Sequence, residues 1–178
     1  MAETDKSSQP RAGDGSSTSR PSTGGGAIVK TPALRLVALD ASDLVVIAAH
    51  LQDAVGRVRD MAFVPKDHRF ALLMNRFDWT AAETRSSAQS YERRRCALRF
   101  EHVRTARVSG FAQADKKVVL SLLTIGFEPR DENDPAGVVT LRFAGEAAIR
   151  LDVECVEAEL TDIGAGWRTA RKPEHPEG

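Results

Sequence analysis

The chain has 178 residues, 42% of them hydrophobic and 28% charged, and its 25 basic and 25 acidic side chains give a formal net charge of zero. Its longest apolar run, Leu44–Ala49, is far shorter than the ~20 residues of a membrane-spanning helix, and the N-terminus lacks the apolar stretch of a signal peptide. Two cysteines, Cys96 and Cys155, exclude a disulfide framework. We therefore expect a cytoplasmic protein.

The two ends of the chain are poor in apolar residues. Residues 1–32 are rich in Ser, Gly and Pro, and residues 171–178 are polar with two prolines. Such segments cannot bury enough apolar surface to offset the entropy lost on ordering, so both are predicted to be disordered tails. The residues between them, 33–170, have the usual size of one globular domain.

A short strand is predicted at 34–39, and the main helix follows it. Asp40 and Asp43 precede an apolar run, which is typical of a helix N-terminus. One face of this helix is apolar and comprises Leu44, Ile47, Ala48, Leu51 and Val55. The spacing predicts a helix over 42–55, with Gly56 as its end.

The rest of the folded part reads as strands. They are predicted over 58–64, 69–75, 96–111, 117–127, 139–143 and 149–155. The segment 96–111 is either one long strand or a bent pair, because its apolar alternation slips at Val103 and again at Ala106, which indicates a bulge. The pattern predicts an α+β fold with a mostly antiparallel, strongly curved or barrel-like sheet of about six to seven strands and one main helix packed on it.

The last predicted hairpin allows a sharper inference. Residues directly opposed across an antiparallel pair share a face, and Phe143 and Ile149 must both face inward. Opposed positions must therefore sum to an even number. A two-residue turn at Gly145-Glu146 would place Arg142 opposite Ile149. We therefore expect either a loop with an odd number of residues, with three as the favoured number, or a bulge.

Charge is distributed unevenly along the chain. Residues 85–107 carry seven arginines and two glutamates, a net charge of +5, whereas residues 128–162 carry ten carboxylates and three arginines, a net charge of −7. We favour the interpretation that the two segments lie side by side in one sheet and neutralise each other. The alternative is a basic patch that meets a phosphate or an acidic partner.

The block Asn75–Trp79 is the most unusual pentapeptide. A ligand-binding interpretation assigns Arg76, Asp78 and Trp79, together with His50 on the helix, to a site for a small anionic ligand. The structural interpretation makes the two aromatic residues anchors of a loop, with Arg76 and Asp78 as an exposed ion pair. On that interpretation Trp79→Ala destabilises the fold, and Arg76→Ala has little effect because exposed ion pairs contribute little.

A basic patch is predicted at Arg93, Arg95, Arg99 and Arg104. Because side chains alternate along a strand, these arginines do not all share a face. The chain has ten aromatic residues for stacking on bases and lacks the aromatic strand motif of RNA-recognition sheets. RNA binding through this strand is therefore the weakest of three functional interpretations.

No catalytic, cofactor or metal motif is apparent. The four histidines stand alone, without a second metal ligand at a suitable spacing. The acidic run of 152–159 suits a solvated strand face better than a cation site. No segment has the spacing of a nucleophile elbow or a phosphate loop. We therefore predict no catalytic residues and no cofactor.

The segment Pro65–Trp79 resembles an uncharacterised bacterial family, the domain-of-unknown-function family numbered 2948. The segments Ala49–Ala54, Phe143–Gly145 and Ile149–Cys155 are similar to it too, and the resemblance covers about 34–167. The family has no established activity, so it gives no catalytic residues to carry over. It implies a small, soluble, stand-alone bacterial protein.

Three functions stay open at this point. The first is a non-enzymatic binding or adaptor domain with a protein partner, because the chain has a folded, sheet-rich core but no catalytic motif. The second is an anionic-ligand protein or enzyme that uses the Asn75–Trp79 block. The third is weak RNA binding through the strand Arg93–Arg107.

Overall fold

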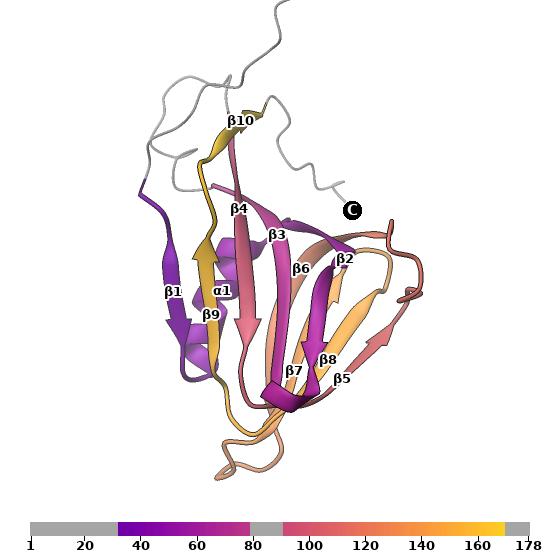
Figure 1. Cartoon of the computed structure of the whole chain (residues 1–178). Helices are drawn as coiled ribbons and strands as arrows, with labels where there is room; N and C mark the ends of the chain where they lie inside the picture. The colour runs from indigo at the N-terminus through magenta and orange to yellow at the C-terminus, as the bar shows by residue number, and fades with distance from the viewer. Residues whose placement is uncertain (1–31, 79–90, 170–178) are drawn as a thin grey trace, which may run out of the picture.

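The computed structural model describes residues 32–78 and 91–169, which form ten strands, one α-helix and one 3-10 helix (Figure 1). The tails predicted at the two ends lie outside the described residues, apart from Pro32. In chain order the elements are β1 (Arg35–Ala38), α1 (Ala41–Leu51), β2 (Val55–Val64), η1 (Pro65–Asp67), β3 (Arg69–Phe77), β4 (Tyr91–Phe100), β5 (Val103–Ser109), β6 (Val119–Pro129), β7 (Gly137–Phe143), β8 (Ala148–Val153), β9 (Ala158–Asp162) and β10 (Trp167–Thr169).

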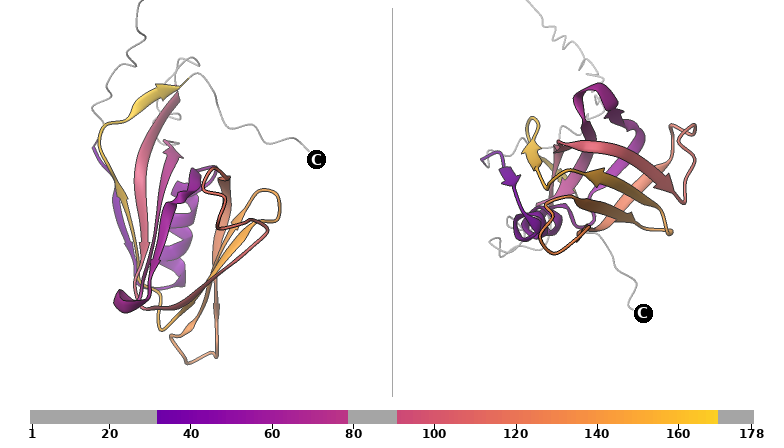
Figure 2. Two further views of the ribbon diagram at one scale, coloured as in Figure 1. Left: turned by 45° about the vertical axis from the view of Figure 1, so that its right-hand side comes forward. Right: turned by 90° about the horizontal axis from the view of Figure 1, so that it is seen from below.

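All the strands belong to one antiparallel sheet, in the order β1-β9-β4-β3-β2-β6-β7-β8-β5, with β10 paired to β4. The sheet bends at β2, which has a bulge between Gly56 and Met61 in its ladder with β3 and pairs with β6 only over Val55–Arg57. The last strand in this order, β5, returns to η1, where the Val103 N–H donates to the His68 carbonyl at 2.7 Å. The bend gives the sheet two arms, which Figure 2 shows facing each other.

The predicted α+β class, with a mostly antiparallel sheet and one main helix, is confirmed, but the predicted strand count and the barrel-like description are wrong. The sheet has ten strands and is not closed. Residues 96–111 form two strands, since the chain turns at Glu101 and His102, whose φ is 56°. After β8, which corresponds to the last predicted strand, the structure has two further strands, β9 and β10. The sheet does not close into a barrel because β5 pairs with β8 alone among the described strands.

Helix α1 lies between the two arms of the sheet (Figure 2). Its N-cap is Asp40, whose carboxylate accepts a hydrogen bond from the Asp43 N–H at 2.8 Å, as the sequence predicts. Its buried face consists of Leu44, Ile47 and Leu51. The predicted end of the helix is wrong: α1 ends at Leu51, because the chain turns at Asp53 (φ 60°) and Val55 already pairs in β2.

The β7–β8 hairpin has the odd loop length that the sequence predicts. Leu141 lies opposite Ile149, and the Phe143 N–H donates to the Ala147 carbonyl at 2.8 Å. This register leaves three residues in the loop, among them Gly145, whose φ of 72° favours glycine. The requirement that both strands bury the same face therefore predicts the odd loop length correctly.

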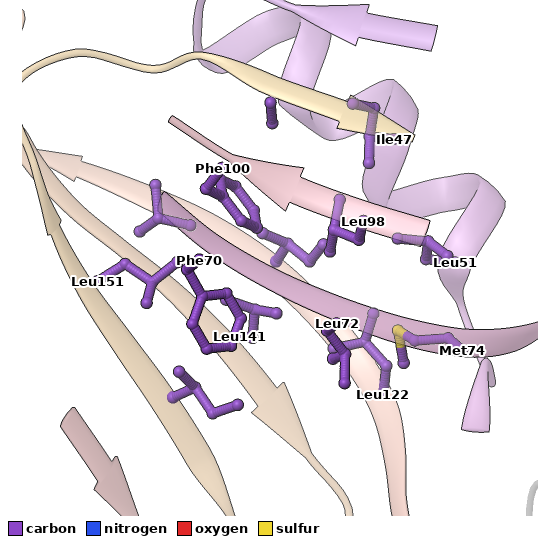
Figure 3. Packing of buried hydrophobic residues seen from close by; sticks show 14 of the residues in the cluster. Ile47, Leu51, Phe70, Leu72, Met74, Leu98, Phe100, Leu122, Leu141 and Leu151 are labelled. Carbon is purple, nitrogen blue, oxygen red and sulfur yellow. The ribbon is translucent and has the colours of Figure 1, made fainter. Parts of the chain in front are cut away.

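The inner face of the bent sheet carries the core. Phe63, Phe70 and Phe100 lie directly opposite one another on β2, β3 and β4, which places an aromatic row across one arm. Phe70 and Leu141 of the other arm belong to one cluster of buried residues, part of which Figure 3 shows, so both arms share one core. No helix in the described part of the chain is long and apolar enough to cross a membrane.

Candidate functional site

Five charged side chains are buried where β3, β4 and β9 end near β10, and we call them the ionic cluster. Its members are Arg76, Asp78, Glu92, Arg94 and Asp162. They lie on the inner face of the sheet, because the alternation that buries Leu72 and Met74 continues to Arg76 and Asp78. The apolar core thus becomes ionic at this end of the strands.

The pair Arg76–Asp162 is the centre of the ionic cluster. The Nε of Arg76 donates to Oδ1 of Asp162 at 2.8 Å, and its Nη2 donates to Oδ2 at 2.9 Å. The two side chains are 4% and 0% exposed. A fork-shaped, bidentate pair of this kind satisfies both carboxylate oxygens and fixes the orientation of the guanidinium.

Arg94 is the second buried guanidinium and lies directly opposite Arg76. Its Nε is 3.4 Å from Oδ2 of Asp78, and its Nη1 is 4.0 Å from Oδ2 of Asp162. Two like charges on opposed positions are unfavourable, and the carboxylates compensate them. Gly166 lies against this guanidinium, since a Cβ there would be 3.3 Å from Nε of Arg94.

The surroundings of Asp162 keep it ionised. Burial alone would raise the pKa of Asp162, but the hydrogen bonds from Arg76 and from the Leu34 N–H, with the positive charges of Arg76 and Arg94, outweigh burial and lower it. Burial likewise works against the charge of Arg76, and the bonds to Asp162 outweigh it, so the Arg76 pKa is raised. Both partners of the central pair therefore stay charged.

The ionic cluster contains two residues of the predicted anionic-ligand site, and their surroundings differ from the expected ones. The prediction that Arg76 forms an exposed ion pair with its neighbour Asp78 is wrong: Arg76 is buried, and its bidentate partner is the distant Asp162. His50 lies half-buried in the last turn of α1, and Trp79 lies outside the described residues. The guanidinium of Arg76 is therefore engaged by Asp162 within the fold.

The predicted neutralisation of the basic and acidic segments is confirmed at β4, β5 and β9. Arg99 lies opposite Glu159, with its Nη2 2.6 Å from Oε2. Nε of Arg104 is 3.3 Å from Oε1 of Glu154. The strands thus bring the +5 and −7 segments side by side, as favourable cross-strand charge pairing requires.

The other two residues of the predicted basic patch do not extend it into a free surface. Arg95 is exposed, and its Nη2 is 4.0 Å from Oδ1 of Asp60. Arg93 is half-buried and lies opposite Phe77 on one side and Trp167 on the other. The four arginines therefore lie among carboxylates and aromatic residues.

A cavity that the sequence did not predict lies between β2 and β5 and has a volume of about 360 Å³. Most of the residues that line it are apolar, among them Met61, Phe63, Phe70, Ala106 and Val108, and Gln113 and Lys116 contribute polar groups. Four of these, Met61 and Phe63 on β2 with Ala106 and Val108 on β5, are half-buried and pack against the core. The core is therefore open to solvent along this line, which we call the β2–β5 seam.

Free strand edges flank the β2–β5 seam. Within the described residues, β5 pairs with β8 only, and the β2–β6 ladder ends at Arg57. Two bonds lie at the ends of these edges: the Val103 N–H donates to the His68 carbonyl, and the Val58 N–H donates to the Val118 carbonyl. Unpaired edges present rows of backbone N–H and C=O groups. The only sequence signal for the seam is the slip of alternation at Val103 and Ala106, where a real register shift follows Val103 in the β5–β8 ladder. That slip reveals the bulge but not which strand edge stays free.

The two cysteines lie in different surroundings. Cys96 is fully buried on β4, and burial raises the pKa of its thiol to about 12. Cys155 is half-buried in the connection after β8.

We expect a thiol reagent in mildly alkaline buffer to leave Cys96 of the native full chain unmodified, because almost none of it is thiolate. Denaturant should expose it to full labelling. The Cys155→Ser variant isolates Cys96, and rapid labelling of that variant under native conditions would contradict its burial.

The described residues hold no group of three or more His, Cys, Asp or Glu side chains placed to bind a metal ion. A comparison with protein families matches residues 34–175 to the family described as "Protein of unknown function (DUF2948)", and the match includes every helix and strand of the described fold. No curated protein matches the chain significantly, and neither does any solved structure. The chain belongs to the DUF2948 family.

Proposed function

We propose that this protein is a non-enzymatic binding domain that takes an extended peptide segment of a protein partner onto the free edge of β5. The observation that carries the proposal is the β2–β5 seam, where a cavity of about 360 Å³ lies beside an unpaired strand edge. Strand addition draws affinity from main-chain hydrogen bonds and specificity from pockets for alternate side chains. The seam offers both.

The cavity supplies the pocket. Ala106 and Val108 of β5 face inward, opposite Leu151 and Ile149 of β8, and the half-buried Phe63 of β2 lines the other side. An added strand would direct every second side chain into this space. Apolar side chains there would remove the exposed part of the core from water, which is the main driving force of association.

The other end of the sheet fits strand addition less well. Strand β1 also lies at an edge, but it has four residues against seven in β5. Short edge strands present few unpaired backbone groups, which is one way in which proteins protect their edges. Val37 on β1 is 52% exposed and does not line the seam cavity, so it serves as a control on the other edge strand.

The test is selection from a display library of random octapeptides on the immobilised full chain. We expect enriched peptides to carry apolar residues at alternate positions, because only alternate side chains enter the cavity. Val108→Asp should abolish their binding, whereas Val37→Asp should leave it unchanged. Circular dichroism and thermal melting of both variants control for folding. Equal loss in the two variants, or no alternation among selected peptides, would contradict the proposal.

A further inference from the structure

The outer face of the sheet next to the seam carries a group of arginines. A shallow cavity of about 360 Å³ there is lined by Thr105, Arg107, Arg130, Val138, Arg150 and Asp152. Nη2 of Arg130 is 3.1 Å from Oδ1 of Asp152, whereas Nη2 of Arg150 comes only within 4.0 Å of Oε2 of Glu128. The surroundings of Arg107 are therefore basic.

Arg107 is the least compensated of these charges. It lies directly opposite Arg150 in the β5–β8 ladder, and like charges at opposed positions are destabilising. Among the described residues it makes no ion pair, and it is exposed. The outward side of β5 thus presents a guanidinium without a carboxylate partner beside the free edge.

Side chains of a strand added to β5 would point alternately to the two faces of the sheet, and this alternation determines which of them would lie beside Arg107. Neighbouring strands lie about 4.8 Å apart, and directly opposed residues share a face. Residues of the added strand opposite Ala106 and Val108 would enter the seam cavity, and the residue opposite Arg107 would lie beside its guanidinium on the outer face. A carboxylate at that position forms a charge-assisted pair, and an ammonium there is repelled.

The β1 edge differs in this respect. Its outward arginine, Arg35, already has a carboxylate, with Nε 2.7 Å from Oε1 of Glu159. An acidic side chain on a strand added there would compete with Glu159 for the same guanidinium. Charge complementarity therefore favours the β5 edge for an acidic segment.

We infer that the peptide bound at β5 alternates apolar residues, which enter the β2–β5 seam, with acidic residues, which pair with Arg107 on the outer face. This inference rests on the proposed strand addition and names the chemistry of its partner. It predicts an interaction that weakens as salt is raised, because the outer-face charges are exposed to solvent.

The test compares three synthetic octapeptides that alternate valine with glutamate, with lysine or with serine, by fluorescence anisotropy on the full chain. We expect the Val–Glu peptide to bind about tenfold more tightly than the Val–Lys peptide, as one charge-assisted hydrogen bond suffices to give. Arg107→Glu should reverse this preference and Arg107→Gln should abolish it. The control Arg35→Glu should leave it unchanged.

The outcomes separate the two proposals. Equal affinity for the glutamate and lysine peptides, or a preference that Arg107→Glu does not alter, overturns the acidic specificity and leaves strand addition intact. If the Val–Ser, Val–Glu and Val–Lys peptides all fail to bind, strand addition itself is wrong. Both Arg107 variants should melt like the wild type, because the side chain is exposed and unpaired among the described residues.

Discussion

Arg76→Ala is expected to lower the free energy of unfolding by about 3–5 kcal/mol, the usual effect of removing one partner of a buried ion pair. The reason is the carboxylate left behind: the Asp162 side chain is 0% exposed and would lose both hydrogen bonds from the guanidinium. Asp162 would then stay buried with the more distant guanidinium of Arg94, 4.0 Å away, as its nearest positive charge. Urea denaturation at neutral pH measures the change.

Two comparisons make this result specific. Arg35→Ala removes an arginine whose side chain is 71% exposed and pairs with Glu159, so the free energy of unfolding should change little. The double variant Arg76→Ala/Asp162→Ala should lose less than the sum of the two single variants, because no lone charge remains from the pair. If Arg76→Ala unfolds at the same urea concentration as Arg35→Ala, the buried pair does not stabilise the fold.

Phe70→Ala is expected to lower the free energy of unfolding by a similar amount, about 3–5 kcal/mol, because it opens a large cavity in the core. Phe70 is 3% exposed, lies between Phe63 and Phe100 in the aromatic row, and belongs to the same core cluster as Leu141 of the other arm. Loss of its ring therefore leaves a void in the core that the two arms share. Thermal and urea denaturation both report the effect.

The neighbouring Phe63 is the matched control. It has the same side chain in the same aromatic row, but it is half-buried at the β2–β5 seam. Phe63→Ala should destabilise the fold distinctly less than Phe70→Ala, since less area is taken from the core. It should also weaken peptide binding. Equal destabilisation by the two variants would mean that the seam is closed in solution.

Local patterns were sufficient for the helix start and for the odd length of the β7–β8 loop. Asp40 and Asp43 form the predicted cap, and the shared inward face of Phe143 and Ile149 requires the odd loop that the structure has. Both inferences depend on interactions between residues close in the chain. The predicted pairing of the basic and acidic segments also held at Arg99, because opposite net charges favour neighbouring strands.

The sequence patterns did not predict which strands pair when they lie far apart in the chain. The alternation slips at Val103 and Ala106 mark the break between β4 and β5, but not that β5 leaves β4 to pair with β8. The open seam follows from that choice, so no local pattern predicts it. The same holds for Arg76, whose parity with Met74 already places it on the inner face, while its partner Asp162 comes from a strand 86 positions away.

Amide hydrogen exchange on the full chain, with and without a saturating octapeptide selected by display, tests strand addition most directly. Strand addition predicts slower exchange in β5 at residues 104–109 upon peptide binding, because N–H groups on the free edge become hydrogen-bonded, whereas the Val103 N–H is already bonded to the His68 carbonyl. Exchange along β1, Arg35–Ala38, should stay unchanged. Protection of β1 in place of β5, or peptide binding without any protection of β5, would contradict the proposal that β5 receives the partner.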